Sequence, residues 1–226
     1  MGLLSALLRT GASECLTMTT ASQAYRLVKR AFDVSFSAAV VVLGAAPGLA
    51  LALLVALDTK GAPIYSETRV GHRGPFPCLK YRTMVVDSDN LEKYFTPEQI
   101  ELWHREHKVP DDPRVTRIGA ILRAIGIDEF PQFVNVLRGE MSIVGPRAIT
   151  ADELERYFDP EQRALYLSVP SGITGAWQVG PRNEATFENG RRMRIELDYV
   201  RNASLKRDFD ILCATFGVMF VKRNGA

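Results

Sequence analysis

The chain contains 226 residues, of which 46% are hydrophobic and 24% are charged, so it can bury one core and carry an appendage. Its 28 Lys and Arg residues nearly balance 26 Asp and Glu residues, and the net charge of +2 argues against a nucleic-acid-binding domain. The widely spaced cysteines Cys15, Cys78 and Cys213 argue against a disulfide framework or a zinc site, and they fit a reducing compartment.

Residues 1–21 are predicted to form a flexible N-terminal tail. They lack the basic start, apolar core and small-residue cleavage site of a secretory signal. Translation could begin at Met1 or at Met18.

Residues 34–57 form the strongest physical signal, because this stretch between Asp33 and Asp58 carries no charge. A straight helix of this length would extend about 36 Å, which is enough to cross a hydrocarbon core of about 30 Å. Pro47 near its middle predicts a sharp bend, because proline removes an amide hydrogen bond and clashes with the preceding turn. Basic residues flank both ends of the stretch, so the charges favour neither end as the inside.

A helix that enters a membrane, bends at Pro47 and returns to the same face explains both the proline and the charges. The sequence therefore favours a re-entrant helix-break-helix over residues 22–58, including a basic lead-in. A fully spanning helix with a kink and the buried core helix of a soluble protein remain the alternatives.

Residues 59–226 have the composition of an ordinary soluble domain. Strands at 64–70 and 77–84 are predicted to form a short β-hairpin. Helices are predicted at residues 87–108, 117–125, 129–138 and 187–202. The segment 205–222 is apolar on one side and basic at both ends, which suits a C-terminal helix on a membrane surface or a plain core helix. The predicted fold class is α+β, mainly α.

Asp128 and Glu129 are the central candidates for chemistry. They precede Pro131 and an apolar run, which places both carboxylates at a predicted helix start, where backbone amides favour ionised acids. An acidic residue at such a position is more often only a helix cap. The surrounding arginines favour a functional role for the pair over a simple helix cap, because guanidinium groups bind phosphate well.

These arginines are Arg114, Arg117, Arg123 and Arg147. Arg147 is predicted on a tight turn, where a solvated side chain is the alternative to a phosphate ligand. Residues 172–179 supply a hydroxyl, an aromatic face and an amide, which suit a base or a sugar but also suit an ordinary loop. Walker and dinucleotide glycine motifs are missing from the sequence. His104 and His107 share a helix face but lack a third metal ligand.

In their order along the chain these motifs resemble those of the bacterial sugar transferases, the monotopic phosphoglycosyl transferases of polysaccharide assembly. The matching segments lie at residues 29–33, 69–71, 80–84, 112–116, 135–142 and 144–147, with Arg123 ahead of the Asp128–Glu129 pair. The resemblance covers residues 28–224.

The resemblance implies a re-entrant membrane helix, Asp128 as the nucleophile and Glu129 as a Mg²⁺ ligand. By this likeness Asp128 attacks a UDP-sugar, UMP leaves, and a phosphosugar-aspartate passes its sugar phosphate to polyprenol (undecaprenyl) phosphate. Enzymes that start exopolysaccharide or O-antigen chains with galactose or glucose look most similar. Lys29 and Arg30 would lie at the level of the acceptor phosphate. The implied substrate-binding residues are Lys80, Arg82, Arg114, Arg117, Arg123, Arg147, Thr174, Trp177, Gln178, Arg182 and Asn183.

The resemblance also implies a bacterial inner-membrane protein whose catalytic domain faces the cytoplasm. Its partners would be a UDP-sugar, polyprenol phosphate and membrane lipid, without nucleic acid, and a homo-oligomer is left open. Departures from the family pattern at Gly126, Ala148, Ala176 and residues 180–183 put loop shape and sugar specificity in doubt. The rival hypotheses are a non-catalytic scaffold of the same fold and a soluble nucleotide-sugar hydrolase.

Overall fold

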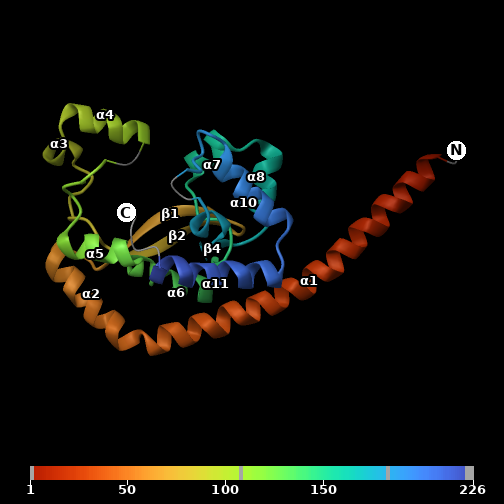
Figure 1. Cartoon of the computed structure of the whole chain (residues 1–226), viewed down its shortest axis with the longest axis horizontal. Coiled ribbons are helices and arrows are strands. Elements are labelled where there is room, and N and C mark those ends of the chain that lie inside the picture. The colour runs from red at the N-terminus through yellow and green to blue at the C-terminus, as the bar shows by residue number, and fades with distance from the viewer. Residues whose placement is uncertain (1–2, 107–108, 182–183, 222–226) are drawn as a thin grey trace.

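The computed structural model describes the backbone of residues 3–106, 109–181 and 184–221, and the side chains of residues 23–104, 109–181 and 184–218. Two helices, α1 (Leu3–Leu43) and α2 (Ala45–Thr59), run along one side of the rest of the chain (Figure 1). The proposed tail, residues 1–21, coincides with the first part of α1, where no side chain is described. A boundary of the chain at residue 21 therefore stays a prediction.

The predicted break in the apolar stretch is present. No described helix is by itself long and apolar enough for a membrane span, but Gln23–Leu43 and Ala45–Thr59 meet that description together, bent by 65°. The break lies at Gly44, one turn earlier than expected, and Pro47 lies in the first turn of α2. Pro47 has no amide hydrogen to donate to the carbonyl of Leu43, so one helical hydrogen bond is lost at the break, although the amides of Gly44 and Gly48 still donate to the carbonyls of Val40 and Gly44.

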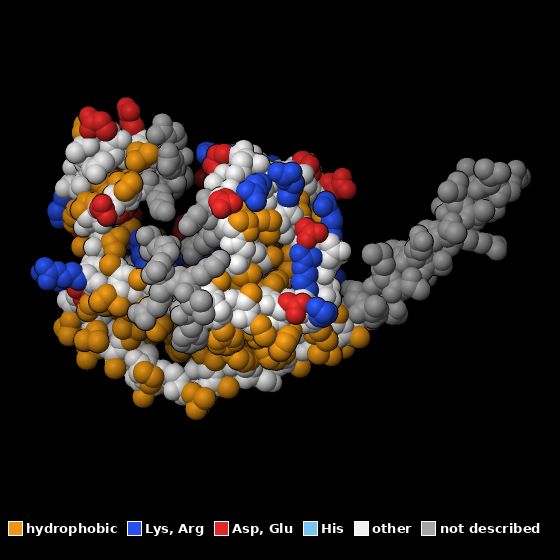
Figure 2. All heavy atoms as spheres, viewed as in Figure 1, with side chains coloured by type: hydrophobic (Ala, Val, Ile, Leu, Met, Phe, Trp, Pro, Cys, Tyr) orange, Lys and Arg blue, Asp and Glu red, His pale blue; other side chains and the backbone are white. Residues whose placement is uncertain are grey.

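Large apolar side chains remain exposed along the bent pair and along α11 (Leu205–Val221), which lies beside α1 (Figure 1). Figure 2 shows them as a nearly continuous orange surface along the lower edge of the molecule. They include Leu27, Val28, Phe32, Leu43, Leu49, Leu53, Leu57, Phe209 and Phe216. Exposed apolar surface of this extent marks contact with a membrane or a partner.

The α11 helix has one buried apolar side and one exposed apolar side. Ile211 on its inner side is 6% exposed and belongs to the main core, whereas Phe209 is 65% exposed.

The sheets are small, and the predicted α+β class with mainly helical content is confirmed. The strands β1 (Ile64–Gly71) and β2 (Gly74–Tyr81) form the predicted hairpin, in which Ile64 pairs with Tyr81, but β2 begins and ends three residues earlier than the predicted strand at 77–84. A second, parallel pair joins β3 (Met141–Val144) to β4 (Ser171–Thr174), and the sequence did not predict it. The other elements are α3 (Leu91–Tyr94), α4 (Pro97–Glu106), α5 (Arg117–Ile125), the 3₁₀ turn η1 (Ile127–Glu129), α6 (Gln132–Arg138), α7 (Ala151–Tyr157), α8 (Pro160–Tyr166), α9 (Ala176–Val179) and α10 (Arg191–Arg201).

Two predicted helices have different boundaries. The segment 87–108 contains two shorter helices, because α3 ends before Pro97 opens α4. The helix expected from residue 187 begins at Arg191, after Gly190 in a left-handed conformation (φ 67°) that disfavours other residues. Three buried clusters hold these elements together, and the one around Val55, Tyr81 and Leu122 joins α2 to β2 and α5.

Lys29 and Arg30 attach α1 to α11 and α6. Lys29 Nζ lies 2.6 Å from Oδ2 of Asp208 in α11. Arg30 donates to the carbonyl oxygens of Val136 and Leu137 near the end of α6, at 2.6 and 3.0 Å. The acceptor role suggested for these two cations would therefore compete with contacts inside the protein.

Asp33, one turn after Lys29, fastens α1 to β3. Its carboxylate accepts a hydrogen bond from the Ser142 hydroxyl at 2.7 Å and from the Ile143 amide at 3.1 Å, and Asp33 is only 3% exposed. Buried donors that lose their acceptor destabilise a fold substantially. Asp33 therefore fixes the position of the bent pair against the strand that leads to Arg147.

We expect Asp33→Asn to lower the free energy of unfolding by about 1–2 kcal/mol, because the neutral amide loses the charge-assisted strength of both hydrogen bonds and the Ser142 hydroxyl must turn to accept from the new NH₂. Denaturant unfolding of the detergent-solubilised protein measures this change. The matched control is Asp210→Asn on α11, whose side chain is 56% exposed and pairs with Lys206 at the surface. That control should change stability by no more than about 0.5 kcal/mol, and equal effects of both variants would contradict the role of Asp33.

Candidate active site

The carboxylates of Asp128 and Glu129 lie in a short turn between two helices. Thr116 caps α5 by accepting a hydrogen bond from the Gly119 amide, and the helix ends at Gly126 with φ 72°. The 3₁₀ turn η1 then carries both acids, and α6 starts at Gln132. The sequence predicted the acids at the start of one helix at residues 129–138. The structure instead places them in a separate 3₁₀ turn before α6. Gly126 suits this left-handed C-cap position.

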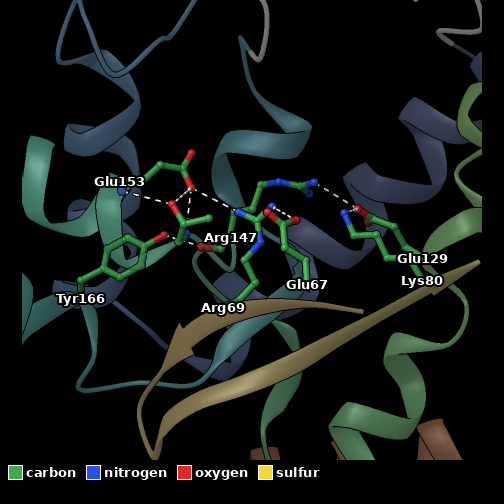
Figure 3. Close-up of polar contacts among 8 residues, drawn as sticks. Glu67, Arg69, Lys80, Glu129, Arg147, Glu153 and Tyr166 are labelled. Carbon is green, nitrogen blue, oxygen red and sulfur yellow. Dashed lines mark hydrogen bonds and ion pairs between the residues drawn. The ribbon is translucent and has the colours of Figure 1, made fainter. Parts of the chain in front are cut away.

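Cationic side chains converge on Glu129 from two strand ends. Arg147 Nη2 donates to Glu129 Oε1 at 3.1 Å, and Lys80 Nζ lies 3.7 Å from the same oxygen. Figure 3 shows both cations directed at this carboxylate, with Arg69 of β1 beside Arg147. The three side chains of the cluster are 21–25% exposed, so solvent and ligands can reach them. A pocket with this charge pattern suits a phosphate group.

The pocket wall combines these charges with buried polar and apolar groups. It is lined by Arg69, Cys78, Lys80, Glu129, Gln132, Met141, Arg147, Ala148 and Gly172. Arg69 donates to Glu153 at 3.2 Å and also pairs with Glu67, so its charge is partly balanced.

Asp128 lies in an environment that opposes its ionisation. Burial raises the pKa of its carboxyl above the ordinary value, and the neighbouring charge of Glu129 raises it further. Lys80 and Arg123 act in the opposite direction and favour the carboxylate. The result is a poorly hydrated acid held next to cations, which is the setting of many nucleophilic carboxylates.

Both backbone polar groups of Arg147 are held by side chains from later helices. Its amide donates to Glu196 Oε1 of α10 at 3.3 Å, and its carbonyl accepts a hydrogen bond from the Tyr166 hydroxyl of α8. Glu196 is fully buried, and this burial raises the pKa of its carboxyl to about 7. These contacts fix the backbone from which the Arg147 guanidinium reaches Glu129.

Oxygen donors for a metal are present but few. Among the described residues, no three His, Cys, Asp or Glu side chains are grouped to hold a metal ion. Mg²⁺ commonly takes one or two carboxylates and completes its shell with phosphate oxygens and water. Glu129 offers one such carboxylate at the pocket wall, so a Mg²⁺ ion held there would depend on phosphate oxygens of the substrate.

Sequence comparison assigns the chain to a family. A family model described as "Bacterial sugar transferase" matches residues 24–222, which include the bent helix pair and every residue of the pocket wall. The chain belongs to the bacterial sugar transferase family. The resemblance deduced from the motifs and the prediction of an enzyme are thus confirmed.

Named relatives support the same assignment. The exopolysaccharide production protein ExoY of Rhizobium meliloti is 38% identical over 201 residues, which cover 87% of each protein. The undecaprenyl-phosphate galactose phosphotransferase of Salmonella typhimurium is 39% identical over 91% of this chain, but the match covers only 43% of that relative. The UDP-glucose:undecaprenyl-phosphate glucose-1-phosphate transferase of Caulobacter vibrioides is 40% identical over 84% of this chain and 68% of that protein.

Within this sugar transferase the predicted arginines have separate roles. Arg147 lines the pocket and Arg123 interacts with Asp128, while Arg123 Nε also donates to the Thr83 hydroxyl at 2.8 Å. Arg114 is 5% exposed and paired with Asp112 at 2.7 Å, and its guanidinium lies 4.4 Å from the ring centroid of Phe95. Arg114 is thus buried and paired away from the pocket wall, and its binding of phosphate stays a prediction.

Two further cations lie outside the pocket wall. Arg117 is exposed at the start of α5. Arg82 donates from Nε to the Ala62 carbonyl at 2.9 Å and covers the Tyr65 ring.

The side chains of the loop predicted to bind a base or a sugar make contacts within the sugar transferase, and their binding role stays a prediction. The Thr174 hydroxyl lies 2.8 Å from that of Thr215 in α11, and the Trp177 indole donates to the Ala185 carbonyl. Arg192 covers the Trp177 ring at 4.1 Å, and Gln178 Nε2 reaches the Ile173 carbonyl at 3.5 Å. Arg182 and Asn183 lie outside the described residues.

The glycines of this loop bring it against the Arg147 turn. A Cβ on Gly172 would lie 2.1 Å from the Gly145 amide nitrogen, and one on Gly175 would lie 2.1 Å from the Gly145 carbonyl oxygen. The motif at residues 172–179 thus positions the turn through its backbone. In the sequence, the spacing of its glycines was the feature that could have revealed this role. Tyr166 and Glu196 belong to no motif and are recognisable only as polar residues on the buried faces of helices.

Proposed function

We propose that this sugar transferase moves a sugar-1-phosphate from a UDP-sugar to undecaprenyl phosphate and so starts a polysaccharide chain. The carrying observation is the Glu129 carboxylate in a pocket whose other charges are the cations Lys80, Arg69 and Arg147, with Asp128 directly before Glu129 in the same short turn. The names of the Salmonella and Caulobacter relatives support the donor and acceptor classes. The sugar itself is galactose or glucose in this proposal.

Asp128 is the proposed nucleophile. Its carboxylate oxygen attacks the phosphorus that carries the sugar, the bond from that phosphorus to the UMP oxygen breaks, and UMP leaves with the electron pair. A phosphate oxygen of the acceptor then attacks the same phosphorus, and the bond to Asp128 breaks to restore the carboxylate. An acyl-phosphate intermediate divides one difficult displacement between two anions into two steps.

The pocket cations have a defined part in both steps. Arg147 and Lys80 offset the charge of the phosphate oxygens, and the guanidinium fork of Arg147 can contact two oxygens at once. Glu129 would hold Mg²⁺, which supplies further neutralisation of phosphate charge when bound. Tyr166 and Glu196 keep the Arg147 backbone fixed while its side chain exchanges Glu129 for substrate.

The exposed apolar side chains of α1, α2 and α11 support a proposal for how the protein contacts the membrane. We propose that the bent pair of α1 and α2 enters the inner membrane and returns to the cytoplasmic side, with α11 lying on the membrane surface. The exposed apolar residues of all three helices support this arrangement, since they line the same side of the molecule (Figure 2). The long prenyl chain of the acceptor would then stay in lipid while its phosphate reaches the pocket.

The test uses purified full-length protein in lipid nanodiscs with Mg²⁺ and UDP-galactose or UDP-glucose. Without acceptor, we expect a burst of UMP that stops at about one equivalent per active protein. Addition of undecaprenyl phosphate should give continuous UMP release and a lipid-linked sugar diphosphate. Continuous release without acceptor would indicate a hydrolase, and no release with either donor would indicate a scaffold, so either result would overturn the proposal.

A further inference from the structure

The aromatic ring that follows the two acids occupies the bend of the membrane helices. Phe130 comes directly after Glu129, and a Cβ on Gly44 would lie 2.5 Å from Phe130 Cζ. One on Gly48, a turn later in α2, would lie 3.4 Å from Phe130 Cε1. The ring therefore fills the space that these two glycines leave open.

A second aromatic residue links the bend to the cationic side of the pocket. Tyr81 is 5% exposed, and its hydroxyl donates to the Gly48 carbonyl at 3.0 Å. Its ring lies nearly parallel to that of Phe130, with 6.5 Å between centroids and 8° between planes. Successive residues of a strand point to opposite faces, so Lys80 faces the pocket while Tyr81 faces the bend.

Further contacts extend this packing to both arms of the bent pair. Phe130 contacts Phe133 edge-on at 6.0 Å, and Phe133 contacts Phe36 of α1 at 6.2 Å. On the other arm, Leu122 of α5 packs in one cluster with Tyr81 and with Val55 of α2. The turn that carries Asp128 and Glu129 therefore lies within the angle between α1 and α2.

We propose that Phe130 and Tyr81 are positioning residues that couple the helix bend to the active site and set the height of Asp128 above the membrane for the lipid acceptor. This inference rests on the proposed function. The two substrates differ in how they reach the pocket. A nucleotide sugar diffuses in from water and can follow a displaced pocket, whereas the phosphate of a prenyl lipid is restricted to the membrane interface.

The expected consequence is a selective defect in the second half of the reaction. A weaker contact between bend and pocket leaves the first step, attack on the donor, nearly intact. It lowers the probability that Asp128 and the lipid phosphate meet at the same depth. A general structural defect would instead affect both steps.

The test compares Tyr81→Phe and Phe130→Leu with wild type in nanodiscs. Tyr81→Phe removes one hydroxyl and its hydrogen bond to Gly48, and Tyr65→Phe is the matched control, since Tyr65 is 45% exposed on β1 and contacts Arg82. We expect kcat/KM for undecaprenyl phosphate to fall about threefold to tenfold in Tyr81→Phe, as for loss of one hydrogen bond, and further in Phe130→Leu. The acceptor-free UMP burst should stay within about twofold of wild type, and Tyr65→Phe should match wild type throughout.

A water-soluble, short-chain prenyl phosphate separates positioning from general damage. Because it is not restricted to the interface, the variants should use it as well as wild type does. Equal losses with the soluble and membrane-bound acceptors, or an equal loss of the UMP burst, would overturn the positioning role. Failure of the wild-type burst would instead overturn the proposed function, so the two failures are distinguishable.

Discussion

Asp128→Asn is expected to eliminate the acceptor-free UMP burst and to reduce turnover by on the order of 10³-fold or more, as for loss of a catalytic nucleophile. The amide has nearly the same shape as the carboxylate but cannot form the acyl phosphate. Rapid acid quench followed by peptide mass analysis measures the same event directly. The wild-type peptide that contains residue 128 should gain one sugar phosphate after reaction with donor, and the variant peptide should not.

Glu129→Gln is the matched comparison, because it removes the adjacent charge and leaves Asp128 in place. Arg147 and Lys80 lose their ionic partner, so we expect slower adduct formation, by about 10²-fold, with the adduct still on residue 128. Its rate should also require a higher Mg²⁺ concentration than wild type. Equal UMP release by wild type and Asp128→Asn would remove Asp128 as nucleophile, and an adduct on another residue would relocate the chemistry.

The local parts of this site could be predicted from sequence because their signals are local. Asp128, Glu129 and Arg147 were recognised by residue type and motif order, and the structure brings Glu129 and Arg147 to 3.1 Å. Arg114 looked equivalent to Arg147 in the sequence. Its partner Asp112 is only two residues away and its aromatic cover comes from Phe95, so the difference depends on tertiary burial that no spacing reveals.

The bent helix shows the same division between local and tertiary signals. Pro47 and the uncharged stretch predicted a break, but the pivot lies at Gly44. Proline disfavours helix in the preceding residues without fixing which one bends. The Phe130 ring, which is far away in sequence, selects Gly44 by occupying the space beside it. The parallel pairing of β3 with β4 was missed for a related reason, since four-residue strands carry almost no periodicity.

Glu196→Gln is expected to stabilise the protein at alkaline pH, by about 3 kcal/mol from the shift in pKa. The folded protein holds the Glu196 carboxyl at a pKa of about 7, raised from 4.5 by burial, despite the opposing charges of Arg192 and Arg147. Between these two values the folded state binds a proton that the unfolded state has released. Stability from this group is therefore full below about pH 4.5, falls as pH rises, and reaches its lowest level above about pH 7.

The variant cannot ionise, and its amide oxygen still accepts the hydrogen bond from the Arg147 amide. Denaturant unfolding in detergent at pH 5 and pH 8 should therefore give a small difference from wild type at pH 5 and a large one at pH 8. Histidine titration contributes equally to both proteins, and Glu155→Gln on the exposed side of α7 controls for loss of a carboxylate at the surface. A pH-independent difference would mean that Glu196 does not titrate in this range. A stabilised variant with lower kcat/KM would show instead that the buried charge of Glu196, although it opposes folding, helps to hold the Arg147 turn against Glu129 and the substrate phosphate.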